Sequence, residues 1–206
     1  MTSRQVPNSS LDMGSEVTLI EVLDRILPVE DAEISAFVAK AFAKQGMKIL
    51  TGAKVQGLRK GADDVTAIVE VNGKVQEIQA DRVISAVGIV GNVEDIGLEG
   101  TGVKVERTHV VIDEWCRTGE PGVYAIGDLV GPPWLAHKAS HEGVICVEKI
   151  AGLNDVHPLD TSNIPGCTYC EPQVASVGAT EQKLIADGLV KGKDYEVGQY
   201  NIQAHG

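Results

Sequence analysis

The stretch GVYAIGDLVGPPWLAHKASHEG, from Gly122 to Gly143, joins an apolar segment, an acidic residue, a proline pair and a helical pattern in one run. Its first part, Gly122–Asp128, has the composition of a strand buried on both faces of a parallel sheet. Pro132-Pro133 then precedes a helical pattern that extends from Leu135 to Ile150. A strand, a loop and a helix in this order are typical of a nucleotide-binding α/β unit.

Six small or apolar residues line one face of the helix predicted from Leu135 to Ile150. An apolar face of this kind is typical of a helix that packs on a core. The six are Ala136, Ala139, Gly143, Val144, Val147 and Ile150. Gly152, two residues after Ile150, is suited to a helix end, because glycine readily adopts left-handed backbone conformations. We interpret His141 as a residue on a face of this helix.

The rest of the chain alternates between short strand patterns and helical patterns. A helical pattern runs from Pro28 to Gly46, and acidic residues lie near its start. Asn72-Gly73 separates two alternating segments and predicts a hairpin with a type I′ turn, since both residues tolerate a positive φ. A short helix is predicted to start at Thr180. The predicted strands are Val17–Val22, Met47–Leu50, Ala53–Val55, Val65–Val71, Lys74–Ala80, Arg82–Gly88, Gly122–Asp128, Pro172–Gly178 and Asp194–Ile202.

The composition narrows the class of protein. Eighteen lysines and arginines against 29 aspartates and glutamates give the 206-residue chain a formal net charge of −11. This charge repels nucleic-acid phosphates and anionic membranes, and no apolar run is long enough to span a bilayer. The polar start of the chain lacks a secretory signal. We therefore expect a cytoplasmic protein that binds neither nucleic acid nor membrane.

An acidic residue, Glu21, ends the apolar run of the first predicted strand. Ligands of open α/β sheets bind beyond the carboxyl ends of the strands. A carboxylate there can accept hydrogen bonds from both ribose hydroxyls of NAD, and its charge repels the additional phosphate of NADP. The alternative is a solvated acid or a helix cap. The glycine-rich fingerprint that should precede such a residue by about 20 positions is absent upstream.

A second acidic residue, Asp128, lies between a predicted strand and the loop that leads into a helix. The free N–H groups and positive dipole of a helix N-terminus suit an electron-rich ligand atom. An aspartate beside them could bind sugar or ribityl hydroxyls. The alternative is a local turn in which the Asp128 side chain bonds its own backbone.

The stretch that follows Gly122 closely resembles the second flavin-binding motif of the dihydrolipoyl dehydrogenases, within the pyridine nucleotide-disulfide oxidoreductase family. The resemblance continues through EVTLIEVLDRILPVEDAEISAFVAKAFAKQGMKI, RVISAVGIVGNVEDIGLE and CTYCEPQVASVGATE, so it covers roughly Gly14 to Gly206. It implies an α/β fold of partial Rossmann-like FAD- and NAD(P)-binding domains with a hairpin insertion, followed by the start of an α+β dimerisation domain. The implied parts are an unstructured tail at 1–13, an NAD-binding part at 14–87, a FAD-contacting segment at 88–160 and a dimerisation part at 161–206.

The resemblance also implies the cofactors FAD and NAD and the residues that contact them, with no metal. The residues expected at the flavin are Asp128 on the ribityl chain and Trp134, Leu135, Ala136 and His137 along the ring. The residues expected at NAD are Glu21 on the adenosine ribose, Val55 on the adenine and Gly88 at the nicotinamide half. The helix dipole would stabilise negative charge on the reduced flavin.

Enzymes of this group oxidise protein-bound dihydrolipoamide and pass electrons through a cysteine pair and FAD to NAD. Their partners are the lipoyl domains of 2-oxo acid dehydrogenase complexes, and they form homodimers. The sequence lacks both the C-x-x-x-x-C pair and the catalytic His-Glu pair of the family. We therefore expect an internal fragment of such an oxidoreductase that is not catalytically competent alone. The alternative is a non-catalytic nucleotide-binding or dimerisation remnant.

The motif Cys167-Thr-Tyr-Cys170 could indicate a redox pair or half of a zinc site. A zinc site needs a second ligand pair at suitable spacing, which the sequence does not offer. A redox pair prefers the start of a helix, whereas this one precedes a predicted strand. We interpret the role of the two cysteines as structural or incidental.

Overall fold

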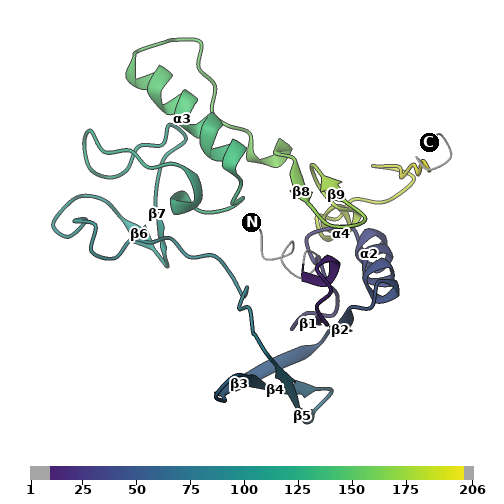
Figure 1. Ribbon diagram of the computed structural model, residues 1–206. Coiled ribbons are helices and arrows are strands. Elements are labelled where there is room, and N and C mark those ends of the chain that lie inside the picture. The colour runs from purple at the N-terminus through teal and green to yellow at the C-terminus, as the bar shows by residue number, and fades with distance from the viewer. Residues whose placement is uncertain (1–9, 202–206) are drawn as a thin grey trace. The chain divides into compact units, whose positions relative to one another are not determined.

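The computed structural model describes residues 10–201 and divides into two compact units (Figure 1). The first unit combines the segment up to Ser85 with the segment from Cys167 onward. The second unit comprises Ala86–Gly166. The sequence-based domain boundaries at 87/88 and 160/161 stay a prediction.

The first unit begins with a β-α-β arrangement. Strand β1 (Thr18–Ile20) pairs in parallel with β2 (Lys48–Leu50), and helix α2 (Ala32–Lys44) connects them. Gly46 ends the helix with φ +102° and donates its N–H to a helix carbonyl, as its position in the sequence predicted. Parallel strands need such a crossover connection. The two strands and the helix predicted for this region are confirmed.

The core of the first unit lies on the inner face of α2. Val38 and Phe42 of this helix are buried against Leu27 before it and Met47 after it. Val174, which lies far along the chain, belongs to the same cluster. The core of this unit is therefore built from two segments that are distant in sequence.

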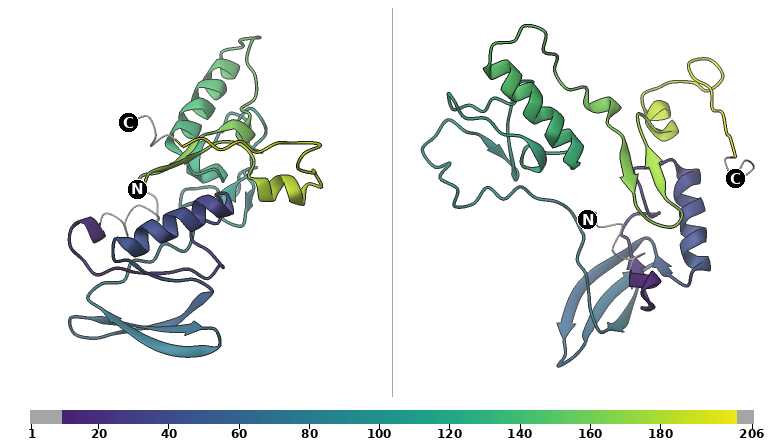
Figure 2. Two further views of the ribbon diagram at one scale, coloured as in Figure 1. Left: turned by 90° about the vertical axis from the view of Figure 1, so that its right-hand side faces the viewer. Right: turned by 45° about the horizontal axis from the view of Figure 1, so that its top comes forward.

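A strongly twisted three-stranded antiparallel sheet follows β2 (Figure 2). Its strands are β3 (Ala53–Lys60), β4 (Val65–Val71) and β5 (Lys74–Ala80). Asn72 and Gly73 have φ angles of 51° and 75° between β4 and β5, as a type I′ turn requires. The predicted hairpin is confirmed, and β3 extends five residues beyond the predicted Ala53–Val55.

The second unit contains little sheet. Its elements are β6 (Val105–Glu106), β7 (His109–Val110), helix α3 (Ala136–Ile150) and the 3-10 helices η1 (Gly127–Val130) and η2 (Thr161–Asn163). The strands predicted at Arg82–Gly88 and Gly122–Asp128 are wrong for the described chain. In the latter stretch only an isolated bridge joins Tyr124 to Arg117. The reason is that residues 10–201 supply no further strand alongside either segment. As a result the apolar side chains are not covered, and Val87 is 97% exposed.

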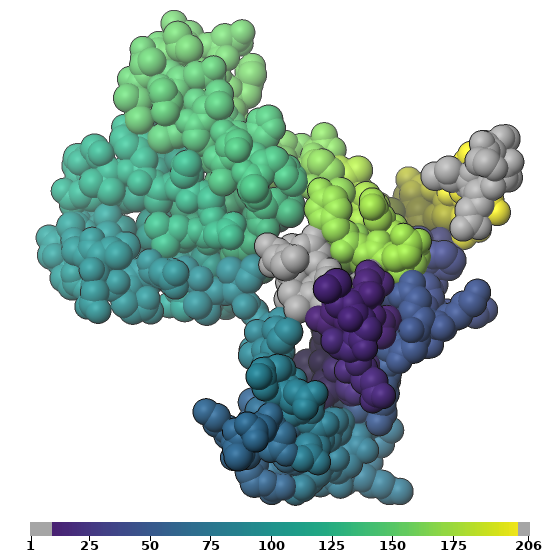
Figure 3. Space-filling model, in the orientation of Figure 1, coloured from purple at the N-terminus to yellow at the C-terminus, as the bar shows by residue number. Residues whose placement is uncertain are grey.

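Helix α3 forms as predicted, and Gly152 follows it with φ +79°. Its predicted apolar face is not the buried one, because Val144, Val147 and Ile150 are exposed. The residues that the helix buries are Lys138, Glu142 and Cys146. The space-filling view shows α3, in green, as part of the outer surface of the second unit (Figure 3). Charged side chains can occupy the buried face because they find partners there, as described below.

The C-terminal segment contains a two-stranded sheet and a short helix. Strand β8 (Gly166–Thr168) pairs with β9 (Val174–Ser176), and Thr180 caps α4 (Glu181–Ala186), as its sequence position predicted. The 3-10 helix η2 precedes β8. The strand predicted at Asp194–Ile202 is wrong for residues 194–201, and Ile202 lies outside the described residues. A local turn replaces its start, in which Gly192 donates its N–H to the carbonyl of Tyr195.

Candidate functional site

Glu21 lies directly after β1, at the edge where the carboxyl ends of β1 and β2 meet. Its N–H donates to the Leu50 carbonyl at 2.8 Å, and its carbonyl accepts from the Ala53 N–H at 3.0 Å. The side-chain Oε1 accepts the N–H of Leu23 at 2.9 Å. The backbone of Glu21 is thus fixed between β2 and β3, and one carboxylate oxygen forms the local bond that the alternative interpretation allowed.

The other two residues predicted to contact NAD lie in different units. Val55 is the third residue of β3, where the side chain is 45% exposed just before a β-bulge. It shares the first unit with Glu21. Gly88 belongs to the second unit, is exposed and has φ +148°, a conformation that favours glycine.

Asp128 is the second residue of η1, and its side chain is exposed. Gly127 and Gly131 flank it with φ angles of 79° and 102°, so the loop turns sharply on both sides of the carboxylate. Within the described chain, the carboxylate of Asp128 has no hydrogen-bond or ion-pair partner. The local side-chain turn that sequence reasoning kept as an alternative is not formed.

The entrance of α3 leaves its first amides without a side-chain cap. Leu135 is the N-cap residue and Ala136 the first helical residue, and neither has an oxygen in its side chain that could accept a hydrogen bond. The first-turn amides therefore remain available for an electron-rich group, with the positive end of the helix dipole behind them. His137 is exposed, and its Nε2 lies 2.8 Å from the Pro165 carbonyl.

Trp134 sits before the helix and packs beside His109 of β7. The two ring centroids are 6.0 Å apart, and the indole Nε1–H donates to His109 Nε2 at 3.4 Å. Sequence reasoning missed His109, because nothing in its local pattern indicated that β7 would approach the loop before α3. His141 is exposed on α3, as expected.

A buried ion pair within α3 forms hydrogen bonds to the backbone of η1. Lys138 Nζ lies 2.9 Å from Glu142 Oε1, and the side chains are only 3% and 8% exposed. Lys138 also donates to the carbonyls of Gly127 and Gly131, while Glu142 Oε2 accepts the N–H of Gly127 at 2.7 Å. Sequence reasoning missed this pair, although Lys and Glu four residues apart on a helix were a visible signal.

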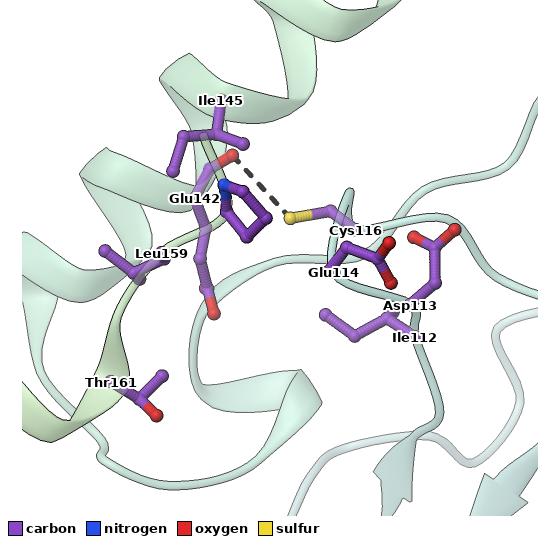
Figure 4. Close-up of a pocket in the computed structure, with 9 residues that line it drawn as sticks. Ile112, Asp113, Glu114, Cys116, Glu142, Ile145, Leu159 and Thr161 are labelled. Carbon is purple, nitrogen blue, oxygen red and sulfur yellow. Dashed lines mark hydrogen bonds between the residues drawn. The ribbon is translucent and has the colours of Figure 1, made fainter. Parts of the chain in front are cut away.

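The second unit also contains a small cavity on another side of Glu142 (Figure 4). Its volume is about 130 Å³, and Cys116, Ile145 and Leu159 contribute to its wall. The Cys116 thiol donates to the backbone carbonyl of Glu142 at 3.7 Å. Burial, and then the negative charge of Glu142, raise the pKa of Cys116 to about 11. None of the predicted site residues lines this cavity.

All four cysteines are free thiols, and in the Cys167–Cys170 motif Cys170 is buried while Cys167 is exposed. Burial raises the pKa of Cys170, whose thiol donates to the Pro172 carbonyl at 3.1 Å. Across residues 10–201, no group of three or more His, Cys, Asp or Glu side chains could hold a metal ion. No helix in that part of the chain is both long and apolar enough to cross a membrane.

The β-α-β unit and the acidic residues beyond its strands and before α3 fit a dinucleotide-dependent oxidoreductase. The chain belongs to the pyridine nucleotide-disulphide oxidoreductase family, whose sequence model matches residues 9–143. Over about 95% of its length it is similar to two bacterial dihydrolipoyl dehydrogenases. It is 57% identical to the one from Rhizobium etli and 49% identical to the one from Zymomonas mobilis. The family resemblance is thereby confirmed.

The chain spans about 40% of the length of these relatives. Among solved structures it is similar to LpdA from Mycobacterium tuberculosis, with a TM-score of 0.80 and 24% identity over 89% of this chain and 39% of that one. The Cu(II) complex of a cysteine-to-serine mutant of the flavoprotein disulfide reductase RclA from Escherichia coli has a TM-score of 0.80 and 23% identity, over 89% of this chain and 41% of that one. These likenesses confirm the predicted α/β fold class.

Proposed function

We propose that this chain forms the central, cofactor-contacting part of a dihydrolipoyl dehydrogenase. In the proposed reaction the two thiols of protein-bound dihydrolipoamide become a disulfide, NAD+ takes up a hydride and one proton is released. FAD, when bound, supplies the two-electron acceptor between the dithiol and NAD+. The observation that carries the proposal is the exposed Asp128 carboxylate before the uncapped entrance of α3, in a chain 57% identical to such an enzyme.

The residues around η1 fit a flavin. Asp128 would accept hydrogen bonds from the ribityl hydroxyls, because its carboxylate has no competing partner within residues 10–201. The first-turn amides of α3 would face the pyrimidine edge and stabilise negative charge on it. Trp134, Leu135, Ala136 and His137 would line the ring, with the Trp134 orientation supported by its contact with His109.

The residues beyond β1 fit NAD. Leu23 uses only one oxygen of the Glu21 carboxylate, so the other remains available for a ribose hydroxyl. The negative charge of Glu21 would disfavour the additional phosphate of NADP. The half-exposed Val55 offers an apolar surface for the adenine, and Gly88 has no side chain to obstruct the nicotinamide half.

Partners and location follow from the same proposal. A dihydrolipoyl dehydrogenase acts on lipoyl domains of 2-oxo acid dehydrogenase complexes and works as a homodimer. We propose both for the protein to which this chain contributes, together with a cytoplasmic location. A net charge of −11 agrees with protein partners rather than nucleic acid.

A second candidate is a non-catalytic nucleotide-binding or dimerisation module. The observation that favours it is the cysteine arrangement, since residues 116, 146, 167 and 170 do not form a C-x-x-x-x-C pair. The buried Cys116 and Cys170 both have raised pKa values, which is the opposite of what an attacking thiolate needs.

The test transplants this chain into a complete enzyme. The segment of the Rhizobium etli dihydrolipoyl dehydrogenase that matches this chain is replaced by it, and the chimera is assayed for bound FAD and for NAD+ reduction by dihydrolipoamide. We expect a yellow, active chimera, from which Asp128→Ala removes FAD and in which Glu21→Ala raises the KM for NAD+. A folded but colourless chimera, or an Asp128→Ala variant with unchanged FAD affinity, would refute the assignment and favour the second candidate.

A further inference from the structure

The loop that carries Asp128 is tied at both ends by two side chains of α3. Lys138 Nζ donates to the carbonyl of Gly127 at 3.2 Å, before Asp128, and to the carbonyl of Gly131 at 3.0 Å, after it. Glu142 Oε2 accepts the Gly127 N–H at 2.7 Å. Both backbone polar groups of Gly127 are therefore bound by the ion pair.

Every hydrogen-bonding group of the ion pair has a partner, either in the loop or within the pair. An ammonium group has three donors, and those of Lys138 go to two loop carbonyls and to Glu142. The two oxygens of Glu142 accept from Lys138 and from Gly127. Such complete satisfaction offsets the cost of removing both charges from water.

Stability alone is a poor reason for this arrangement. A buried ion pair can often be replaced by apolar residues of similar size without loss of stability. What apolar side chains cannot do is hold the carbonyls of Gly127 and Gly131 in fixed directions. The hydrogen bonds to these carbonyls fix the backbone on either side of Asp128. The glycines that flank this residue would otherwise allow the backbone to rotate more freely.

We infer that Lys138 and Glu142 are positioning residues that hold the 127–131 loop in the conformation that presents Asp128 to a hydroxyl-bearing ligand. The inference rests on the proposed function, in which this ligand is the ribityl chain of FAD. The two residues do not contact the ligand. They act by fixing the direction of the Asp128 carboxylate before binding, so that binding does not have to order the loop.

The test uses two variants of the clamp and a matched control. Lys138→Met removes the bonds to both loop carbonyls, and the double variant Lys138→Met/Glu142→Met removes the clamp while leaving no unpaired buried charge. The control is Lys183→Met in α4, because Lys183 also pairs with an acid four residues later, Asp187, but on an exposed surface. All three are made in the 206-residue chain and in the chimera described above.

Two measurements are made on each variant. Hydrogen exchange of the Gly127 amide in the 206-residue chain reports loop order without any ligand. FAD affinity and the KM for NAD+ in the chimera separate a local effect on the loop from general loss of structure, since Glu21 lies in the other unit. Circular dichroism shows which variants are folded at the temperature used, and the double variant keeps the test available if the single variant unfolds.

We expect both clamp variants to speed exchange at Gly127 and to weaken FAD binding about tenfold, the lower end of the loss seen when residues that orient metal ligands are removed. The KM for NAD+ should stay constant, and Lys183→Met should change nothing. If Asp128→Ala weakens FAD binding but the clamp variants do not, the clamp is wrong and the proposed function stands. If the clamp variants speed exchange but Asp128→Ala leaves FAD affinity unchanged, the proposed function fails and with it the role of the clamp in ligand binding. Unchanged exchange at Gly127 would overturn the clamp itself.

Discussion

The four cysteines should react with a thiol reagent at very different rates. Cys167 is exposed, whereas the side chain of Cys116 is only 3% exposed and lies near the negative charge of Glu142. Only the thiolate attacks the reagent, so both the pKa and the exposure of each thiol determine its rate. Native protein treated with Ellman's reagent should show one fast thiol, and denatured protein should show four.

The raised pKa of Cys116 contributes to this difference. At about pH 8, a thiol with a pKa of about 11 is ionised in roughly one molecule in 1,000, whereas an ordinary thiol is ionised in roughly one in four. The reactive thiolate fraction of Cys116 is therefore about 200-fold lower than that of an ordinary exposed cysteine. Burial of the sulfur adds to this, because the reagent reaches it only when the unit opens locally.

The raised pKa of Cys116 also makes the stability of the folded protein depend on pH. The pKa of the folded thiol is raised above that of the unfolded thiol, so its contribution to stability is complete below the unfolded pKa, about 8.5. That contribution falls as the pH rises from there towards about 11. Chemical denaturation of native protein and of Cys116→Ser should therefore show a steeper alkaline loss for the native protein.

Single substitutions assign the reacting thiol. Cys167→Ser should abolish the fast reaction, and Cys116→Ser should leave it intact. Loss of the fast thiol in Cys116→Ser, or reaction of the native protein at four thiols as quickly as the denatured protein, would refute the burial of Cys116 and the exposure of Cys167.

Two further substitutions probe the two units separately by urea denaturation. Val38→Ala, at a fully buried position in α2, should lower the free energy of unfolding by about 2 kcal/mol, because two methyl groups leave the core; no change would mean that this cluster is not packed. Gly127→Ala should cost about 1–2 kcal/mol, because φ is +79° and the new Cβ would lie 3.3 Å from the Ala139 Cβ; equal stability would contradict the left-handed conformation.

Elements with local signals could be predicted from the sequence. Asn72-Gly73 determines its own turn, and helix α2 has its apolar pattern and its stop signal, Gly46, within one short stretch. The strands at Arg82–Gly88 and Gly122–Asp128 were predicted from apolar composition alone. A strand also requires a neighbour, and the sequence of one segment does not reveal whether a neighbour is present.

The candidate site likewise contains some residues that the sequence predicted and others that it did not. Glu21 and Asp128 could be found because both follow apolar runs, where ligands of α/β proteins gather. The roles of Lys138 and Glu142 depend on the loop carbonyl and amide groups that they reach, and backbone groups have no signature in a sequence. For the same reason, the apolar pattern of α3 predicted a face that is exposed at Val144 and Val147.

The shared core of the first unit has a consequence for how the protein is made. The Asp31 carboxylate accepts the N–H of Glu181, 150 positions later, and Gln45 donates to the carbonyl of Glu171. A ribosome must therefore synthesise the whole of Ala86–Gly166 before the residues that complete the α2 core emerge from it. During that interval Val38 and Phe42 lack the contact with Val174 that completes their cluster, and the apolar face of α2 stays incompletely covered.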